Sequence, residues 1–262
     1  LAIPMPFIPL NNEVRNDADL VLVVGSRLGE TDWWGKAPYW RHPSEQQMIQ
    51  VDIDGHILGA NKPAALAVQA DAKLFLAALA ERVATLTGRM NLESRRRKVA
   101  KYREKAREER AKLDEKLTDM AVPMNPAHVA HVCEQVFPAE SVLVADGGNA
   151  AVWAMMFTQS RVPNTILSTF KMGMLGAGVA QATGAAVARP EHPVCCIIGD
   201  GAMGFHPQEV ETAVRNGLRV VYVVLCDKQW GMVKMNQQFM LKPIKTLIKK
   251  SLGPDETIKA DL

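Results

Sequence analysis

Residues 194–233 read VCCIIGDGAMGFHPQEVETAVRNGLRVVYVVLCDKQWGMV, and this stretch decides the fold class of the chain. An apolar run at 194–198 ends abruptly in Gly199-Asp200-Gly201, and a second apolar run at 220–225 ends in Cys226-Asp227-Lys228-Gln229. Short apolar runs bounded by turn residues are typical of buried strands. We therefore predict two parallel strands, joined by a helix, that each deliver a carboxylate to the same edge of one sheet.

That edge, at the carboxyl ends of the strands, is where open α/β sheets bind ligands. Two hard oxygen donors there suit a divalent cation, and a helix N-terminus behind Gly201 suits a diphosphate. Gly199, Gly201 and Ala202 are small where backbone would approach phosphate. Two structural alternatives remain, because Asp200 could cap the following helix and the glycines could form an ordinary tight turn.

The length, charge and composition of the chain restrict the kinds of protein that it can be. The chain has 262 residues, enough for one large or two ordinary domains, and 48% of them are hydrophobic. Its net charge of +3 is too small to indicate a polyanionic partner, so we expect no nucleic-acid binding. No apolar stretch is long enough to span a bilayer, and the first twenty residues lack a signal-peptide pattern. We therefore expect a cytoplasmic protein with no membrane partner.

The four cysteines show no metal-type spacing, and three of them lie in or at the end of apolar strand-like runs. This pattern predicts buried free thiols in a reducing compartment. The four are Cys133, Cys195, Cys196 and Cys226.

Residues 1–88 alternate strand-like and helix-like patterns. Strands are predicted at 18–25, 48–54 and 66–71, and a helix at 72–87. Strands that alternate with helices indicate a parallel α/β sheet.

The segment 91–116, NLESRRRKVAKYREKAREERAKLDEK, is dominated by interleaved acidic and basic helix formers without Pro or Gly. A charged connecting helix is favoured over a nucleic-acid arm, because acids interleave with the bases and no aromatic ladder accompanies them. Glu93 and Arg97 are spaced to attract one another on such a helix.

The last region, from residue 120, repeats the α/β pattern. A helix is predicted at 127–136, a strand at 141–145, the loop Asp146-Gly147-Gly148-Asn149 after it, and a helix rich in small residues at 174–188. The region closes with the two strands of residues 194–225.

The Gly-Asp-Gly at 199–201 resembles the thiamine-diphosphate signature, which is Gly-Asp-Gly followed by an Asn near the end of the next strand. Asp227 stands at the position of that Asn, at the matching distance from Asp200. DLVLVVGSRLGE at 19–30 and IQVDIDGHILGANKPAALAVQADA at 49–72 resemble the central domain of the same enzymes. The chain is thus similar to the middle and C-terminal parts of thiamine-diphosphate enzymes of the acetolactate synthase and pyruvate oxidase superfamily.

This resemblance implies an α/β fold of two parallel-sheet domains. Residues 1–88 would form part of a Rossmann-like central domain, 89–119 a charged linker helix, and 120–262 a pyrophosphate-binding domain that stops short at its C-terminus. The superfamily's pyrimidine-binding domain has no counterpart here, so we expect a fragment or one chain of a split enzyme.

The resemblance also implies a site. Asp200 and Asp227 would ligate Mg²⁺ through their side chains, and Gln229 through its backbone carbonyl. Asp227 stands where the signature has Asn, and its extra charge would either tighten metal binding or repel the diphosphate. The residues expected to contact thiamine diphosphate are Gly148, Asn149, Gly173, Leu175, Gly199, Asp200, Gly201, Ala202, Asp227, Gln229, Gly231 and Met232.

Within that set, the amide of Asn149 would donate to the diphosphate, and the carbonyl of Gly173 would accept from the 4′-amino group. Leu175 would hold the cofactor in a V shape that brings this amino group beside its reactive carbon. An Asx-stabilised turn at Asn149 and simple core packing around Leu175 are the structural alternatives. Trp230 and Met235 either line the substrate pocket or only pack.

No catalytic residue is expected in this chain, because the activating Glu of the superfamily lies on the pyrimidine-binding domain. We therefore expect these residues alone to be inactive, and the intact protein to be a homodimer or homotetramer completed by a pyrimidine-binding domain. Flavin binding (FAD) is possible by resemblance, although no residue here argues for it.

The leading functional hypothesis is a thiamine-diphosphate- and Mg-dependent carbon–carbon lyase or carboligase acting on 2-oxo acids. A 2-hydroxyacyl-CoA or oxalyl-CoA type lyase, with an acyl-CoA substrate, is the second enzyme hypothesis, suggested by the loop at 146–149 and the turn at 25–28. A non-catalytic cofactor-binding paralogue is the third, suggested by Asp227.

Overall fold

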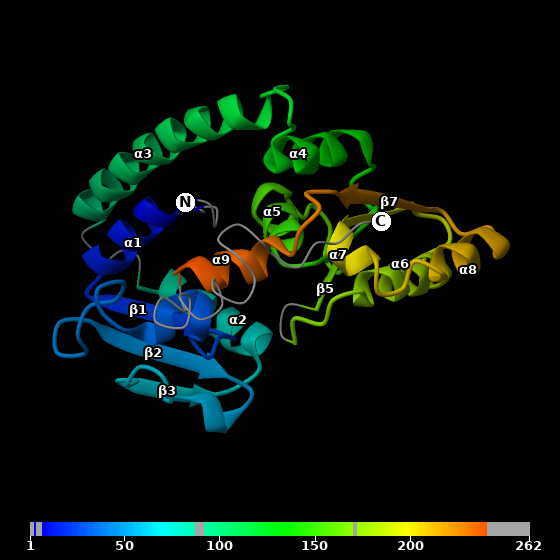
Figure 1. Cartoon of the computed structure of the whole chain (residues 1–262). Coiled ribbons are helices and arrows are strands. Elements are labelled where there is room, and N and C mark those ends of the chain that lie inside the picture. The colour runs from blue at the N-terminus through cyan, green and yellow to red at the C-terminus, as the bar shows by residue number, and fades with distance from the viewer. Residues whose placement is uncertain (1–2, 4–6, 87–91, 170–171, 240–262) are drawn as a thin grey trace. The chain divides into compact units, whose positions relative to one another are not determined.

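The computed structural model describes residues 3, 7–86, 92–169 and 172–239. The chain divides into two compact units, Leu1–Lys112 and Leu113–Leu262. Each unit contains one parallel sheet with helices around it (Figure 1). The predicted fold class, α/β with two parallel sheets, is confirmed. The boundary between the units lies inside a helix, and the domain limits at 88 and 119 stay predictions.

The first unit is built on three parallel strands in the order β1-β2-β3. They are β1 (Leu20–Val24), β2 (Gln47–Asp52) and β3 (Leu66–Gln69), which lie within or close to the predicted segments. Val23 and Met48 on one face of the sheet pack with Leu28 and Trp40 to form a small core. The linking segments carry η1 (Glu30–Gly35) and η2 (Gly55–Ile57).

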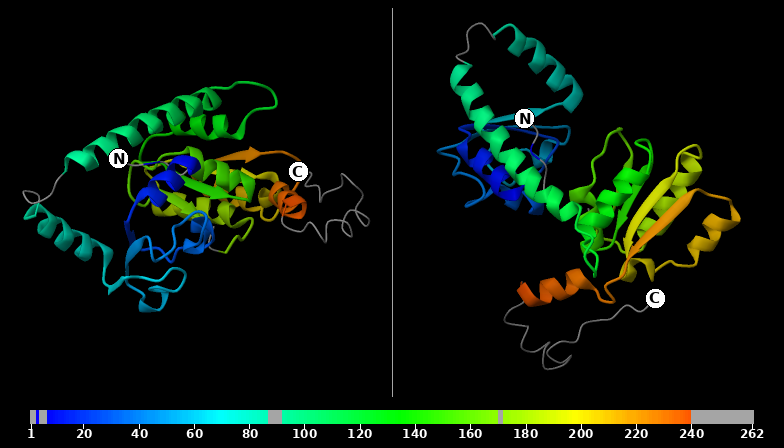
Figure 2. Two further views of the ribbon diagram at one scale, coloured as in Figure 1. Left: turned by 90° about the vertical axis from the view of Figure 1, so that its left-hand side faces the viewer. Right: turned by 90° about the horizontal axis from the view of Figure 1, so that it is seen from above.

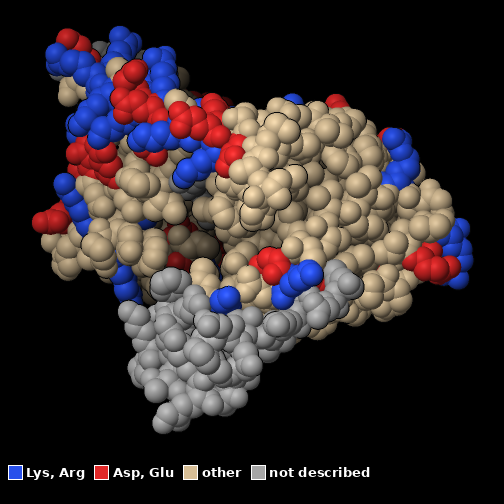
Figure 3. Space-filling view, turned by 45° about the horizontal axis from the view of Figure 1, so that its top comes forward, with Lys and Arg blue, Asp and Glu red and all other residues tan. Residues whose placement is uncertain are grey.

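Three helices accompany this sheet. The helix α2 (Ala72–Ala84) begins after Asp71, whose side chain accepts from the amide of Leu74 at 3.0 Å, as an N-cap should. The helix α3 (Glu93–Leu117) is the predicted charged helix. Its acidic and basic side chains interleave along its length (Figure 3), and Glu93 and Arg97 form the predicted pair at 3.7 Å. The helix α1 (Ile8–Asp17) was not predicted.

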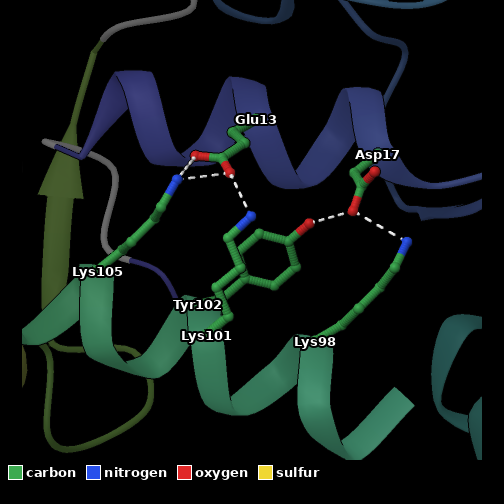
Figure 4. A network of polar contacts seen from close by, with 6 residues as sticks. All are labelled: Glu13, Asp17, Lys98, Lys101, Tyr102 and Lys105. Carbon is green, nitrogen blue, oxygen red and sulfur yellow. Dashed lines mark hydrogen bonds and ion pairs between the residues drawn. The ribbon is translucent and has the colours of Figure 1, made fainter. Parts of the chain in front are cut away.

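A network of polar contacts joins α1 to α3 (Figure 4). Two carboxylates of α1, Glu13 and Asp17, face three lysines of α3 and the hydroxyl of Tyr102. The ammonium of Lys105 lies 2.5 Å from Glu13, and that of Lys98 lies 3.0 Å from Asp17. Tyr102 is buried and donates to Asp17, so this part of α3 is held to the first unit by both charge and burial.

The second unit is built on four parallel strands in the order β5-β4-β6-β7. They are β4 (Val142–Asp146), β5 (Ile166–Ser168), β6 (Val194–Gly199) and β7 (Val220–Leu225). The chain moves outward from β4 to β5 and then returns past β4 to β6. The strand order therefore reverses between β4 and β6, which is where such sheets place their ligand crevice.

Helices cover both faces of this second sheet (Figures 1 and 2). On one face, α4 (Pro126–Val136) and α5 (Asn149–Phe157) enclose a core with Cys195 and Ile197 of β6. On the other, α6 (Ala177–Ala188) packs its small side chains against Cys196 and Ile198. Because alternate residues of β6 enter opposite cores, the whole strand is apolar, as expected for a central parallel strand.

The structure differs from the sequence predictions in several local features. The single helix expected between β6 and β7 is two short helices, α7 (Asp200–Met203) and α8 (Glu209–Arg215), separated by a segment that contains Gly204 and Pro207. The helix α6 starts later than predicted, because Gly176 before it has a positive φ of 85°. The elements β5, α5 and α9 (Gly231–Phe239) were not predicted.

The cysteine prediction is corrected at one position. All four thiols are free, and Cys133, Cys195 and Cys196 are buried as predicted. Cys226 is exposed, because it follows the last residue of β7 and no longer faces either core. None of the helices within the described ranges is long and apolar enough to cross a membrane.

Candidate functional site

The candidate site lies where β4, β6 and β7 end. Asp146 closes β4, Gly199 closes β6 and Leu225 closes β7. The register pairs Asp146 with Ile198 and Gly199 with Leu225, so the three strands end nearly level. The loops that follow them therefore meet at the switch point of the sheet, as the two strand-ending aspartates predicted.

Asp200 is the buried centre of this site. The residue is 2% exposed, although it carries a carboxylate and stands at the start of the short helix α7. One oxygen accepts from the amide of Gly201 and the other from the amide of Lys228, each at 2.7 Å. The helix α7 has Gly199 at its N-cap position, so Asp200 does not act as a capping residue. It instead links the loop after β6 to the loop after β7.

The loop after β7 carries the second carboxylate. Asp227 is exposed, and its Oδ1 accepts from the amide of Gln229 at 3.1 Å. The carbonyl of Gln229 accepts from Gly231 at 3.0 Å. Lys228 between them has a φ of 55°, a left-handed conformation that is unfavourable for a residue with a Cβ. This conformation places the amide of Lys228 on Asp200.

Gly231 allows two predicted site residues to approach one another. A Cβ at this position would lie 2.8 Å from the Nδ2 of Asn149 and 3.0 Å from the Oδ2 of Asp227. Any larger residue would push these side chains away. The amide after β4 and the carboxylate after β7 thus flank the same glycine.

Two further glycines bring the loops into close contact. A Cβ on Gly148 would lie 2.6 Å from the Cβ of Met232, so the N-cap of α5 packs directly on α9. Gly147 has a φ of 95°, and a Cβ there would lie 3.2 Å from the amide of Gly199 and 3.5 Å from the Cβ of Ala202. Gly199 and Ala202, which were predicted to approach phosphate, are therefore in close contact with the loop after β4.

An aromatic side chain covers the turn after β6. A Cβ on Gly201 would lie 2.9 Å from the ring of Trp230. The Trp230 ring in turn lies 6.1 Å from the ring of Phe205. Trp230 thus packs on the Gly-Asp-Gly turn and borders the site.

The segment before α6 carries the other two predicted contacts. Gly173 is exposed with a φ of 63°, and a Cβ there would meet open space. Leu175 is half-buried and packs against the core beneath α6. Gly176, next to it, is closely packed, since a Cβ would lie 2.6 Å from Phe205. The structure links this segment to the site through Phe205 and Trp230.

Sequence reasoning missed the role of Asp146. Its side chain is 2% exposed, and its Oδ2 accepts from the buried amide of Gly178 at 2.7 Å. This bond joins the end of β4 to the first turn of α6. Lys234 was also missed, and its ammonium lies 3.0 Å from the side-chain oxygen of Gln229. A carboxylate that ends an apolar strand was the available signal for Asp146.

The donor set fits a magnesium ion. Each oxygen of an ionised carboxylate can accept more than one bond, so Asp200 keeps acceptor capacity beside its two backbone bonds. Asp227 and the Gln229 carbonyl add oxygen, the ligand type that Mg²⁺ prefers. No cluster of three or more His, Cys, Asp or Glu that could hold a metal occurs among the described residues.

The end of β4 also offers donors to an anion. The helix α5 begins after Gly148 without a side-chain cap, and only from Val152 onward do its amides enter the helical pattern. The amides of its first turn therefore point out of the helix toward the switch point. Together with the side chain of Asn149, they suit a diphosphate.

These features define a parallel α/β domain with a candidate metal and diphosphate site at its switch point. Residues 146–255 match the family described as "Thiamine pyrophosphate enzyme, C-terminal TPP binding domain". Residues 5–79 match "Thiamine pyrophosphate enzyme, central domain". The chain therefore belongs to the thiamine-pyrophosphate-dependent enzymes.

Similar proteins have several different activities. Sulfoacetaldehyde acetyltransferase of Castellaniella defragrans is 29% identical over 240 residues, covering 84% of this chain and 39% of that protein. Human 2-hydroxyacyl-CoA lyase 2 is 32% identical over 171 residues, and the match covers 65% of this chain and 26% of that protein. Acetolactate synthase 1 of Nicotiana tabacum, a chloroplastic enzyme, is 28% identical over 224 residues. That match covers 85% of this chain and 32% of that protein.

A solved structure of a thiamin diphosphate-dependent enzyme from Mycobacterium smegmatis shares the fold. It has a TM-score of 0.57 and 21% identity, and the match covers 83% of this chain and 39% of that one. The chain thus spans about two fifths or less of the relatives it matches.

Proposed function

We propose that this chain carries the diphosphate-binding half of a thiamine-diphosphate site, and that the whole protein is a Mg-dependent carbon–carbon lyase or carboligase acting on 2-oxo acids. The observation that carries the proposal is the bond from the amide of Lys228 to Asp200. It holds the end of β6 and the loop after β7 together, and Asp227 of that loop lies with Asn149 close to Gly231.

Each residue has a stated part in this proposal. Asp200, Asp227 and the carbonyl of Gln229 would hold Mg²⁺, and Asn149 with the first amides of α5 would hold the diphosphate. When bound, thiamine diphosphate supplies a nucleophilic carbon for attack on a carbonyl group. Trp230 would keep water from the turn that it covers.

The extra charge of Asp227 has a neighbour that can offset it. The ammonium of Lys234 donates to the side chain of Gln229, which is two residues after Asp227. Lys228 directly follows Asp227 in the sequence. One lysine on this loop and one in α9 reduce the repulsion that the carboxylate of Asp227 would exert on a diphosphate. Asp227 therefore argues for a tighter metal site rather than for a lost one.

A 2-hydroxyacyl-CoA type lyase is a second candidate. Its support is the loop at 146–149 and the 32% identity to a protein with that name. A strict requirement for coenzyme A thioesters in turnover would favour it over 2-oxo acids. The cytoplasmic location, the pyrimidine-binding partner domain and the homodimer or homotetramer all remain proposals.

Calorimetric titration of thiamine diphosphate into the full-length protein, with and without Mg²⁺, tests the site. We expect Mg-dependent binding that weakens at least tenfold in Asp200→Asn, because a neutral amide removes one charge from the metal. Glu140→Gln, an exposed carboxylate of the same unit, is the matched control. Equal binding with and without Mg²⁺, or no effect of Asp200→Asn, would overturn the metal assignment. Binding without turnover of 2-oxo acids or acyl-CoA would favour a non-catalytic paralogue.

A further inference from the structure

A cavity opens on the second unit at the edge of the sheet away from the candidate cofactor site. Its lining includes Leu143 and Cys195, each second in its strand, and Ile166, the first residue of β5. Its volume is about 60 Å³. At roughly 10–15 Å³ for each water in this measure, it holds about four to six water molecules, or a solute of similar size.

Two thiols line this cavity together. Cys133, on α4, is 9% exposed, and Cys195, on β6, is 3% exposed. Both belong to the same packed cluster of side chains between α4, α5 and the sheet. They come from segments that are far apart in the sequence, so the fold alone brings them together.

The neighbouring cysteine provides an internal contrast. Cys196 follows Cys195 in β6 and therefore points to the opposite face of the sheet. It is 0% exposed, belongs to the core beneath α6, and lies 3.7 Å from the carbonyl of Gly178. Two adjacent thiols of one strand thus face a cavity and a closed core respectively.

We propose that Cys133 and Cys195 form a peroxide-reactive dithiol that closes to an intramolecular disulfide. The Cys133 thiolate attacks one oxygen of hydrogen peroxide, the O–O bond breaks, and hydroxide leaves and takes up a proton as water. The resulting sulfenic acid is attacked by the sulfur of Cys195, which loses its proton. The S–S bond forms and a second water leaves. Two thiols are oxidised by two electrons and one peroxide is reduced to two waters.

The roles of the two sulfurs follow from their surroundings. Hydrogen bonding with Cys195 lowers the pKa of Cys133, although burial opposes this. The same contact, together with burial, raises the pKa of Cys195. Cys133 is also the more exposed of the two, at 9% against 3% for Cys195. We therefore assign Cys133 as the attacking sulfur and Cys195 as the resolving one, because reactivity follows both thiolate character and access.

The hydroxyl of Ser141 could assist the attack on peroxide. Ser141 is among the residues that line the cavity. Its Oγ is buried and has no hydrogen-bond partner within the described part of the chain. Buried hydroxyls are nearly always paired. A peroxide in the cavity would give Ser141 a partner, and its O–H would stabilise the departing oxygen.

The small volume of the cavity limits which oxidants can reach the two thiols. A few water volumes admit hydrogen peroxide and exclude a tripeptide disulfide such as oxidised glutathione. The exposed Cys226 has no such limit, so we expect it to react with either oxidant. The two reagents therefore distinguish the cavity pair from a surface thiol.

The test is mass-spectrometric mapping of thiols in the folded, full-length protein after a short exposure to hydrogen peroxide. We expect a cross-linked pair of peptides carrying Cys133 and Cys195, with Cys196 still reduced. Oxidised glutathione should modify Cys226 and leave the pair reduced. Oxidation of Cys226 alone, or equal oxidation of Cys195 and Cys196, would overturn the proposal.

Variants separate the two sulfurs. In Cys195→Ala, Cys133 should stop at a sulfenic acid that dimedone traps, and in Cys133→Ala the rate of Cys195 oxidation should fall at least tenfold. Ser141→Ala should slow the wild-type reaction severalfold. The absence of a dimedone adduct in Cys195→Ala, or unchanged oxidation rates in Cys133→Ala and Ser141→Ala, would contradict the mechanism. The mapping of the wild-type protein tests the pair even where a variant fails to fold.

Discussion

The amide of Lys228 donates to the buried carboxylate of Asp200 at 2.7 Å, across 28 residues of sequence. This bond ties the loop after β7 to the end of β6, and Lys228 makes it with a left-handed backbone, at a φ of 55°. An unfavourable conformation that is held by a buried carboxylate is the kind of local strain found at binding sites. Asp200 therefore has a structural role in addition to its proposed role as a metal ligand.

That double role predicts different stabilities for two aspartate variants without cofactor. Asp200→Ala leaves the amides of Gly201 and Lys228 without their acceptor, and we expect a loss of about 1–3 kcal/mol in the free energy of unfolding. Asp227→Ala removes an exposed side chain whose bond from the amide of Gln229 water can replace, and we expect a change of about 0.5 kcal/mol. Urea unfolding of both variants in metal-free buffer measures the difference. Equal losses would contradict a structural role specific to Asp200.

Gly231→Ala should impair the candidate site without unfolding the protein. The new methyl group would meet Asn149 and Asp227 at 2.8 and 3.0 Å, and these side chains must move apart. We expect the affinity for thiamine diphosphate with Mg²⁺ to fall at least tenfold while the near-ultraviolet circular dichroism is retained. Calorimetry provides the measurement, and unchanged affinity would exclude Asn149 and Asp227 as joint contacts.

Two glycines of α6 provide a matched pair for stability. A Cβ on Gly178 would lie 2.4 Å from the Cβ of Asp146, whose carboxylate bonds the amide of Gly178. Gly178→Ala should therefore cost about 1–3 kcal/mol through overpacking. Gly184 is exposed and a Cβ there meets open space, so Gly184→Ala should stabilise by about 0.5–1 kcal/mol. Thermal melts of the two variants should shift in opposite directions, and shifts of the same sign would contradict this account.

Stability at high pH should depend on Tyr102. Burial and then the hydrogen bond to Asp17 raise the pKa of Tyr102 to about 12, from an ordinary value of 10.0. Because the folded state holds this proton more tightly, the contribution of Tyr102 is complete below pH 10 and is lost as the pH rises toward 12. The free energy of unfolding should thus fall more steeply between these pH values in wild type than in Tyr102→Phe.

Tyr39→Phe, in the same unit and stacked on Trp33, is the control for removing a tyrosine hydroxyl. Parallel pH curves for wild type and Tyr102→Phe would show that the Asp17 contact does not form in solution. The comparison between variants is necessary because it separates the contribution of the Tyr102 hydroxyl from that of the rest of the chain.

Local pattern predicted most of the second sheet. The strand β7 has the predicted limits, and β6 extends the predicted run by one residue. Apolar β-branched runs that end in glycine or aspartate carry this information locally, and they also located Asp200 and Asp227. The strand β5 was missed because it has only three residues, and α5 was missed because its alanine-rich start follows two glycines without a polar cap.

By itself, the sequence determined the α/β class, the two carboxylates at strand ends and the free state of the thiols, because each depends on the composition of a short segment. The tertiary structure decided the strand order that makes β4 and β6 neighbours, the bonds of Asp200 to Lys228 and of Asp146 to Gly178, and the meeting of Cys133 and Cys195. These contacts join residues that are distant in the chain. Which distant residues meet is set by how the strands and helices pack together, and no pattern within a single segment encodes it.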